Sequence, residues 1–140
     1  MVQIEDCVNY QLLQVCKAHR QRGEVALAKL GLHVGQDQIL FRLWEKDGQP
    51  QSQLAASASC DLSTTTKAVQ RMEREGLVER RQDPEDARIS CVYLTEHGRS
   101  LCEPALGVWK ELEERFLQGM NVAEQMLLRR LLQQAAANLS

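Results

Sequence analysis

A stretch of hydroxyl, amide and cationic side chains recurs at helical spacing between residues 62 and 75 of this 140-residue chain. On a helical wheel its polar face carries Ser63, Thr64, Lys67, Gln70, Arg71 and Arg74. Thr65, Val69 and Met72 fall on the opposite, inward face. Hydroxyls, amides and cations hydrogen-bond base edges and phosphates, so this stretch could recognise DNA. Taken alone, this helix could equally be an ordinary solvent-exposed helix that binds nothing.

A polar segment, residues 82–88, lies between two stretches in which the pattern changes from helical to alternating. The alternation predicts short strands over residues 78–81 and 89–94, joined by the polar segment as a hairpin loop. The chain carries 17 basic and 19 acidic residues, for a net charge of −2, which excludes binding of polyanions by bulk charge. Any nucleic-acid binding therefore needs a local patch, and residues 67–81 hold five cations and three acids.

Apolar residues at helical spacing predict the elements that position these side chains. The predicted helices cover residues 5–30, 36–46, 50–58, 62–75, 96–119 and 121–138. Pro50 suits the first position of the third helix, and Asp61 suits the N-cap of the fourth. Gly76 is a typical residue to follow the end of that fourth helix.

Four other residues predict where the long helices begin or weaken. Gly23 permits a bend in the first helix. Thr95 caps the fifth helix, and Pro104 should kink it or displace its start. Asn121 and Glu124 form a capping box that opens the last helix.

Two short helices, a tight turn and a two-stranded hairpin predict a winged helix-turn-helix, whose second helix enters the major groove. The predicted fold is mainly α (α+β), with one domain over residues 1–140. A winged lobe would occupy about 36–95, and helical dimerisation regions about 1–35 and 96–140. A helix over residues 96–119 would be about 36 Å long, and its apolar stripe exceeds what the lobe can cover. We therefore expect a homodimer, which would cover the remaining apolar surface and bind a near-palindromic operator.

Three segments together resemble the MarR family of bacterial regulators. They are the stretch from Asp61 to Arg80, the loop Asp83-Pro-Glu-Asp86-Ala-Arg88, and Leu94-Thr95-Glu-His-Gly98. The family pattern has Leu-Glu-x-x-Gly-Leu-Val-x-Arg, a wing of Asp-x-x-Asp-x-Arg, and Leu-Thr-x-x-Gly. Met72 replaces the first leucine of that pattern.

The resemblance implies a homodimeric repressor that binds double-stranded DNA and interleaves the first and last helices of its two subunits. It also implies that Arg88 enters the minor groove, oriented by an acid that we expect to be Asp86. The DNA-contact residues expected from both arguments are Ser63, Thr64, Thr66, Lys67, Gln70, Arg71, Arg74, Asp86 and Arg88.

Family members commonly release DNA when a phenolic or other small ligand, or an oxidant, shifts the two winged lobes. The resemblance places the ligand pocket between the dimer helices and the lobe. The residues expected to line it are His19, Arg20, His33, Gln36 and Trp109. A cation or imidazole beside an aromatic ring would suit a phenolic carboxylate.

The chain has five cysteines at scattered spacing, without a Cys-x-x-Cys pair, so we expect free thiols and no metal or other cofactor. We expect Cys60, Cys91 and Cys102 to pack in the core. Cys7 and Cys16 are the candidates for an oxidant-sensing alternative. They lie nine residues apart on one predicted helix, about 13.5 Å along its axis, and cannot bridge each other.

Other classes of protein have weaker support. A thiol enzyme would rest on Cys16 and His19 alone, without an orienting acid, so we expect no enzyme. A winged-helix module that binds protein instead of DNA is favoured only by the acidic net charge. No apolar run is long enough to cross a membrane, and the first seven residues carry two acids and no base, unlike a secretory signal. We therefore expect a cytoplasmic protein.

Overall fold

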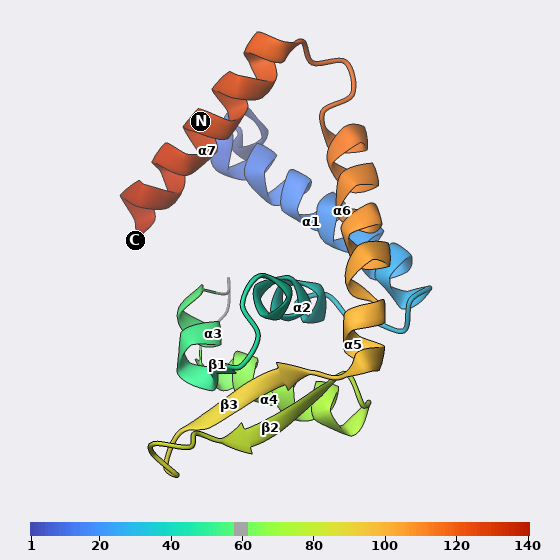
Figure 1. The fold of residues 1–140 in the computed structure, drawn as a ribbon. Helices are drawn as coiled ribbons and strands as arrows, with labels where there is room; N and C mark the ends of the chain where they lie inside the picture. The colour runs from blue at the N-terminus through green and yellow to red at the C-terminus, as the bar shows by residue number, and fades with distance from the viewer. Residues whose placement is uncertain (58–61) are drawn as a thin grey trace.

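The computed structural model describes residues 1–57 and 62–140. It contains a small lobe built on a three-stranded sheet and a helical arm that extends from this lobe (Figure 1). The elements in chain order are η1 (Ile4–Asp6), α1 (Val8–Ala28), α2 (Gln36–Glu45), β1 (Gln49–Pro50), α3 (Gln51–Ser57), α4 (Leu62–Arg74), β2 (Val78–Gln82), β3 (Ser90–Leu94), α5 (Glu96–Ser100), α6 (Cys102–Phe116) and α7 (Val122–Leu139). This mainly helical fold with a small antiparallel sheet confirms the predicted class.

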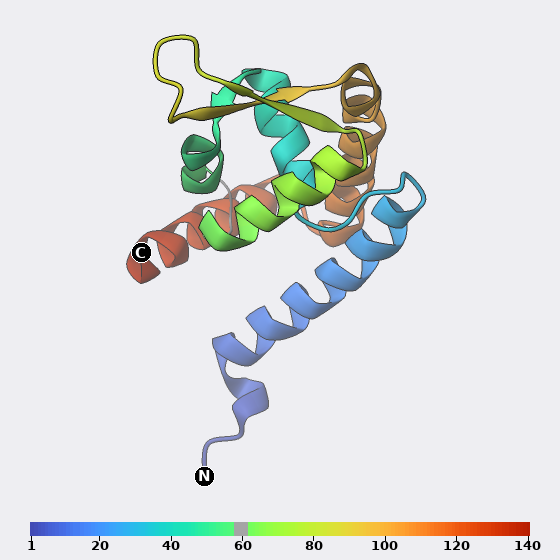
Figure 2. The same ribbon diagram turned by 90° about the horizontal axis from the view of Figure 1, so that it is seen from below.

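The winged lobe, residues 36–94, packs α2, α3 and α4 against the sheet, and Figure 2 shows α4 lying next to β2. The strand order is β1-β3-β2, with β3 antiparallel to both neighbours. The core of the winged lobe contains the fully buried side chains of Leu40, Leu43, Leu54, Val69, Met72 and Val92. These contacts fix the orientation of α4, so its outer face is presented on a rigid support.

The end of α4 is fixed by Gly76, which adopts a φ of 75°. The amide of Leu77 donates to the carbonyl of Met72 at 2.9 Å, and that of Gly76 donates to Glu73 at 3.1 Å. This is a Schellman motif, which needs a left-handed residue at the position of Gly76. The predicted stop at Gly76 is confirmed.

The predicted helix over residues 96–119 is two helices, α5 and α6, separated at Leu101. Pro104 lies in the first turn of α6, where its missing N–H costs nothing, and its ring would clash with the carbonyl of Ser100 in a continuous helix. The sequence predicts that Pro104 kinks this helix or displaces its start, and the structure shows an interruption at Leu101, so the single long helix is wrong. With 15 residues, α6 is about 22 Å long instead of about 36 Å.

Other boundaries also differ from the predictions. The hairpin gains a third strand because Pro50 pairs with Cys91 in β1, so α3 begins at Gln51. The first helix begins at Val8 and runs unbroken through Gly23, which is buried where an added Cβ would lie 3.9 Å from Val34. The predicted cap at Asp61 lies outside the described residues.

The helical arm consists of α1, α6 and α7. The first two pack against each other, and α7 projects from the end of α6 (Figure 1). The predicted capping box opens α7: the Glu124 amide donates to Asn121 Oδ1, and the Asn121 amide donates to Glu124 Oε1, both at 2.9 Å. Among the described residues, no helix has the length and hydropathy needed to cross a membrane.

Candidate nucleic-acid interface

The outer face of α4 presents the polar side chains that the sequence assigns to it. Ser63, Thr64, Lys67, Gln70, Arg71 and Arg74 are exposed, whereas Thr65, Val69 and Met72 are buried. Thr66 differs from the other candidates because it is half-buried, and its hydroxyl oxygen accepts a hydrogen bond from Gln51 Nε2 of α3 at 2.8 Å. This contact joins the two helices of the helix-turn-helix.

Ion pairs divide the cations of this surface into two groups. Arg71 Nε lies 2.8 Å from Glu75, and Arg80 donates two hydrogen bonds to Glu73, at 3.0 and 3.2 Å. The Arg80 contact lowers the pKa of Glu73, so this acid stays charged. Lys67 and Arg74 have no ion-pair partner within the described ranges, which leaves their charges for an external anion such as phosphate.

The wing loop holds Arg88 out from the protein surface. Asp86 Oδ1 accepts from the Arg88 backbone amide at 3.0 Å and from Nε at 3.1 Å, while Oδ2 accepts from Nη2 at 3.2 Å. These bonds lower the pKa of Asp86. Asp83 shapes the same turn by accepting from the amides of Glu85 and Asp86. With its side chain 91% exposed, Arg88 is a guanidinium oriented at the tip and free to enter a groove.

Two contacts near the wing escaped sequence reasoning. The Arg81 guanidinium lies 4.5 Å from the ring centroid of Tyr93, and Arg81 is also paired with Glu79. Asp47 accepts from the Leu94 amide at 2.9 Å and from Arg99 at 3.1 Å, which ties the turn after α2 to β3 and α5. The first was detectable as a cation and an aromatic ring on one face of adjacent strands. The second joins residues 52 positions apart and left no local signal.

Three of the residues expected to bind an effector meet at the start of α2. Gln36 Oε1 accepts from the His33 amide at 3.0 Å, and the buried Gln36 amide nitrogen has no partner in the described structure. Trp109 of α6 donates its indole N–H to Asp37 Oδ2 at 2.5 Å and stacks edge-on against Phe41, with 5.4 Å between centroids. This contact connects the arm to the lobe.

The other two effector candidates lie apart from that group on α1. His19 lines a cavity of about 240 Å³ between α1 and α6. Arg20 is ion-paired with Glu24 at 3.1 Å. The structure therefore divides the predicted effector residues between two places.

The cysteines also separate by exposure. Cys91 and Cys102 are buried, as predicted, and burial raises the pKa of both thiols, which disfavours the reactive thiolate. Cys60 lies outside the described residues. Cys7 is half-buried at the N-cap of α1, and Cys16 is exposed on the same helix.

A helix-turn-helix followed by a β-hairpin defines a winged helix protein, and the tip of this hairpin carries an oriented arginine. The MarR family model matches residues 32–90. The chain is 35% identical over 135 residues to the HTH-type transcriptional repressor IacR of Pseudomonas putida, covering 96% of this chain and 81% of the relative. The chain belongs to the MarR family of transcriptional regulators.

Solved structures share the whole fold. Bordetella bronchiseptica BpsR, in a study of how 6-hydroxynicotinic acid regulates its DNA binding, matches with a TM-score of 0.90 and 20% identity over 97% of both chains. A MarR-family regulator from Listeria monocytogenes, complexed with 26mer DNA, matches with a TM-score of 0.86 and 22% identity over 96% of this chain and 89% of that one. At these identities the likeness establishes the fold alone.

Proposed function

We propose that this chain is a homodimeric repressor that places α4 in the major groove of double-stranded DNA and Arg88 in the adjacent minor groove. The observation that carries the proposal is the exposed Arg88 guanidinium, bonded through two nitrogens to Asp86. A cation held in this way suits the negative potential of a narrow minor groove. The repressor name of the Pseudomonas relative and the DNA in the Listeria structure support it.

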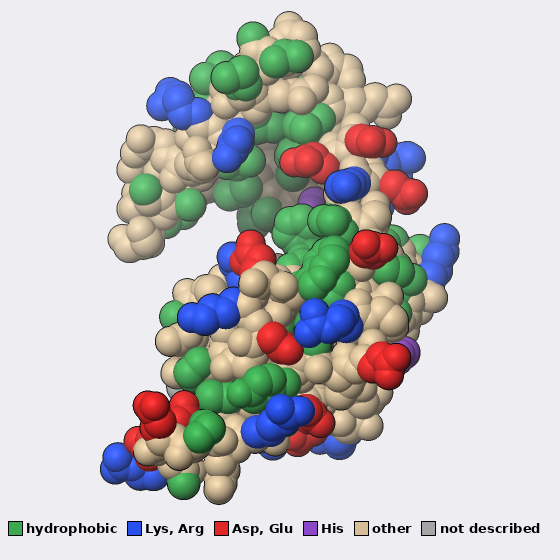
Figure 3. Space-filling view, in the orientation of Figure 1, with side chains coloured by type: hydrophobic (Ala, Val, Ile, Leu, Met, Phe, Trp, Pro, Cys, Tyr) green, Lys and Arg blue, Asp and Glu red, His purple; other side chains and the backbone are tan. Residues whose placement is uncertain are grey.

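The helical arm supports the dimer in this proposal. Its exposed apolar side chains include Val8, Leu12, Leu13, Val15, Val122, Met126, Leu127, Leu131 and Leu132. Figure 3 shows apolar side chains around the hollow between the arm and the winged lobe. An apolar surface of this extent favours a partner, and a second copy related by a two-fold axis would cover it and pair two winged lobes on a near-palindromic operator.

We further propose that a small aromatic acid releases the repressor from DNA. The group at the start of α2 supports this, since the Trp109–Asp37 bond joins the arm to the lobe and the buried amide nitrogen of the neighbouring Gln36 has no partner among the described residues. The Bordetella structure, with 6-hydroxynicotinic acid in its description, offers a chemical precedent. Such a regulator would work in the cytoplasm, where a bacterial chromosome lies.

An oxidant response through Cys7 or Cys16 remains a second candidate, since Cys16 is exposed on α1 and Cys7, at the N-cap of that helix, is only half-buried. DNA binding measured in reductant, with a panel of aromatic acids, and after mild peroxide separates the two. Release by an acid favours the effector. Release by peroxide that Cys7→Ser or Cys16→Ser abolishes favours the thiol.

Replacing Lys67 with alanine should weaken DNA binding and flatten its salt dependence. Because Lys67 has no ion-pair partner in the described part of the chain, its loss removes about one phosphate contact, and the slope of log K against log salt falls by about one. Fluorescence anisotropy between 50 and 300 mM salt measures this slope. Arg20→Ala, which removes an ion-paired cation of the arm, should leave it unchanged. An unaltered slope in Lys67→Ala would remove Lys67 from the phosphate contacts.

Replacing Leu131 with glutamate should shift the protein from dimer to monomer, because a carboxylate would be buried in the proposed interface. Leu131 is 47% exposed on α7 in the single chain, so the substitution spares the core. Sedimentation velocity measures the change. Gln133→Glu, about 200° away around the same helix, is the control and should stay dimeric. A Leu131→Glu protein that remains a dimer would contradict the proposed interface.

A further inference from the structure

The winged lobe and the helical arm are joined at two points along α6. The first is the start of α6, where the chain arrives through α5 and where Cys102 and Ala105 are fully buried in the apolar core. The second is Trp109, about 10 Å further along the axis of α6, whose indole donates to Asp37 of α2. Because this second point lies away from the break at Leu101, a contact there can set the angle between the arm and the lobe.

On the lobe side, α2 holds the Trp109 indole with two side chains. The buried carboxylate of Asp37 accepts the indole N–H through Oδ2 at 2.5 Å and the Gly35 amide through Oδ1 at 3.0 Å. Its place in the first turn of α2 favours the charged form, and a charged acceptor makes the stronger bond. Phe41, one turn later on the same face of α2, meets the indole edge-on with 5.4 Å between centroids. These contacts fix both the distance and the direction of the indole.

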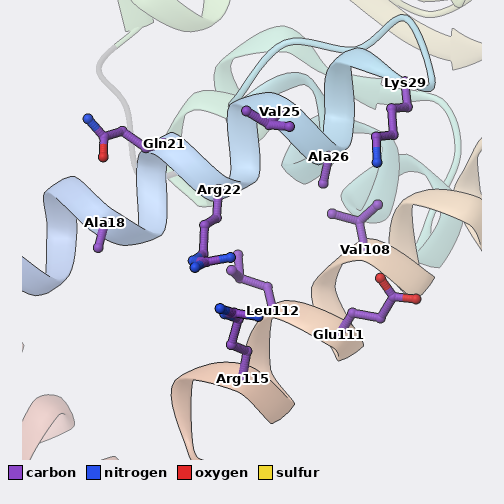
Figure 4. A pocket seen from close by; sticks show the side chains of 10 residues that line it. All are labelled: Ala18, Gln21, Arg22, Val25, Ala26, Lys29, Val108, Glu111, Leu112 and Arg115. Carbon is purple, nitrogen blue, oxygen red and sulfur yellow. The ribbon is translucent and has the colours of Figure 1, made fainter.

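On the arm side, α6 is held by α1. Val108 and Leu112 of α6 line the cavity between the two helices, and Figure 4 shows both on the side of α6 that faces α1. Trp109 follows Val108 about 100° around the helix and contacts α2 instead. One side of α6 therefore lies against α1 and a neighbouring side against α2, which restricts rotation of α6 about its own axis. A swing of the lobe about Leu101 is the motion that the Trp109–Asp37 bond opposes.

A small slip at this bond would move the lobe by a distance that matters on DNA. At about 10 Å from the break, a slip of about 1 Å corresponds to a rotation of about 6°. The winged lobe, as a compact unit of its length, should be about 25 Å across, so this rotation displaces its far side by about 2.5 Å. In a dimer the displacements of two lobes add to about 5 Å, which exceeds the rise of one base pair, about 3.4 Å.

We propose that Trp109 and Asp37 are positioning residues that set the spacing between the two DNA half-sites which the dimer accepts. The inference rests on the proposed homodimeric repressor. Neither side chain touches DNA in this proposal, because both act through the angle of the lobe that carries α4. Without the bond each lobe still binds its half-site, but the dimer distinguishes less sharply between one spacing and the next.

Operators that differ only in the number of base pairs between the half-sites test the proposal. Trp109→Phe keeps a ring beside Phe41 and removes the N–H, and Asp37→Asn keeps the shape but replaces one acceptor oxygen with a donor. Fluorescence anisotropy compares the selected operator with versions one base pair shorter and longer. In each variant the preference for the selected spacing should fall at least about threefold, since hydrogen bonds to charged groups are the stronger kind. Trp44→Phe, which changes an exposed indole on α2, is the matched control and should keep the wild-type preference.

A second measurement on the free dimer needs no DNA. A spin label at Gln53→Cys, an exposed position on α3, reports the distance between the two lobes by pulsed electron paramagnetic resonance. The background for labelling replaces Cys7, Cys16 and Cys60 with serine. The distance distribution should be broader in both variants than in the wild type and the control. A bond that only stabilises the fold would lower the melting temperature and leave the distance distribution and the spacing preference unchanged.

The proposal is overturned if tight DNA binding by the wild type is accompanied by the same spacing preference in both variants, in which case the repressor function stands. An unchanged distance distribution also overturns it. If Asp37→Asn fails to fold, Trp109→Phe decides alone, because Trp109 is 45% exposed and its replacement spares the core. If the wild type binds no duplex while the variants still broaden the distribution, the repressor function fails and the positioning of the lobe by this bond is supported. A label distance that is absent because no dimer forms would overturn both.

Discussion

Arg88→Ala should weaken binding to the specific operator by about 1–3 kcal/mol while leaving the dimer intact. The side chain is 91% exposed, and within the described residues its hydrogen bonds go only to Asp86. Its removal should therefore leave the stability of the fold unchanged. The loss should fall on specific DNA more than on unrelated DNA, because a minor-groove arginine reads groove width. Anisotropy with operator and scrambled duplexes at one salt concentration measures both affinities. Equal affinity of wild type and variant would contradict the wing contact.

A companion variant, Asp86→Ala, separates orientation from bulk charge. It removes an acid from the wing and changes the net charge from −2 to −1, so simple electrostatics predicts tighter binding. Our structure predicts weaker binding, because Asp86 accepts three hydrogen bonds that fix the backbone and guanidinium of Arg88. Arg20→Ala, far from the wing on α1, is the charge control for Arg88→Ala, and Glu24→Ala, which removes the acid of the same ion pair, is the charge control for Asp86→Ala. Tighter binding by Asp86→Ala would show that this acid only repels phosphate.

Gly98→Ala should destabilise the protein by about 2 kcal/mol or more, with a fall in melting temperature of about 5–10 °C. A Cβ on Gly98 would lie 2.0 Å from the carbonyl oxygen of Leu77, which is backbone and cannot rotate away. The same carbonyl accepts from the Thr95 amide at 3.1 Å, so moving it also strains the start of α5. Thermal unfolding followed by circular dichroism measures the change.

The matched control for Gly98→Ala is Gly107→Ala in α6. An added Cβ there would have no neighbour within 4 Å, and alanine favours a helix by about 1 kcal/mol over glycine. The control should therefore keep or raise the melting temperature. A Gly98→Ala protein that melts with the wild type would contradict the close approach of α5 to Leu77.

Local signals predicted the parts of the fold that depend on neighbours in the chain. The stop at Gly76, the cap at Thr95 and the box of Asn121 with Glu124 each rest on contacts within five residues, and all three are present. The inward and outward faces of α4 followed from helical periodicity in the same way. The resemblance to the MarR family added the pairing of Arg88 with Asp86, which periodicity alone could not supply.

Other features depend on contacts between distant segments and could not be predicted. The strand β1 exists because Gln49 and Pro50 meet Val92 and Cys91, across about 40 residues of chain. The Trp109–Asp37 bond likewise joins residues 72 positions apart. The count of five cations in residues 67–81 overstated the positive charge that is available to DNA, since Glu73 and Glu75 form ion pairs with Arg80 and Arg71 in the folded chain.

The central claim is that the chain recognises a particular DNA sequence. The most direct measurement is a binding titration on duplexes recovered by selection from genomic fragments. Those fragments should include the region upstream of the protein's own gene. We expect the recovered duplex to bind at least about a thousandfold more tightly than a scrambled duplex of equal length at the same salt concentration. The stoichiometry should be one dimer per duplex, and the preference should fall in Arg88→Ala. Equal affinity for recovered and scrambled duplexes would contradict the account and favour a winged helix that binds protein instead.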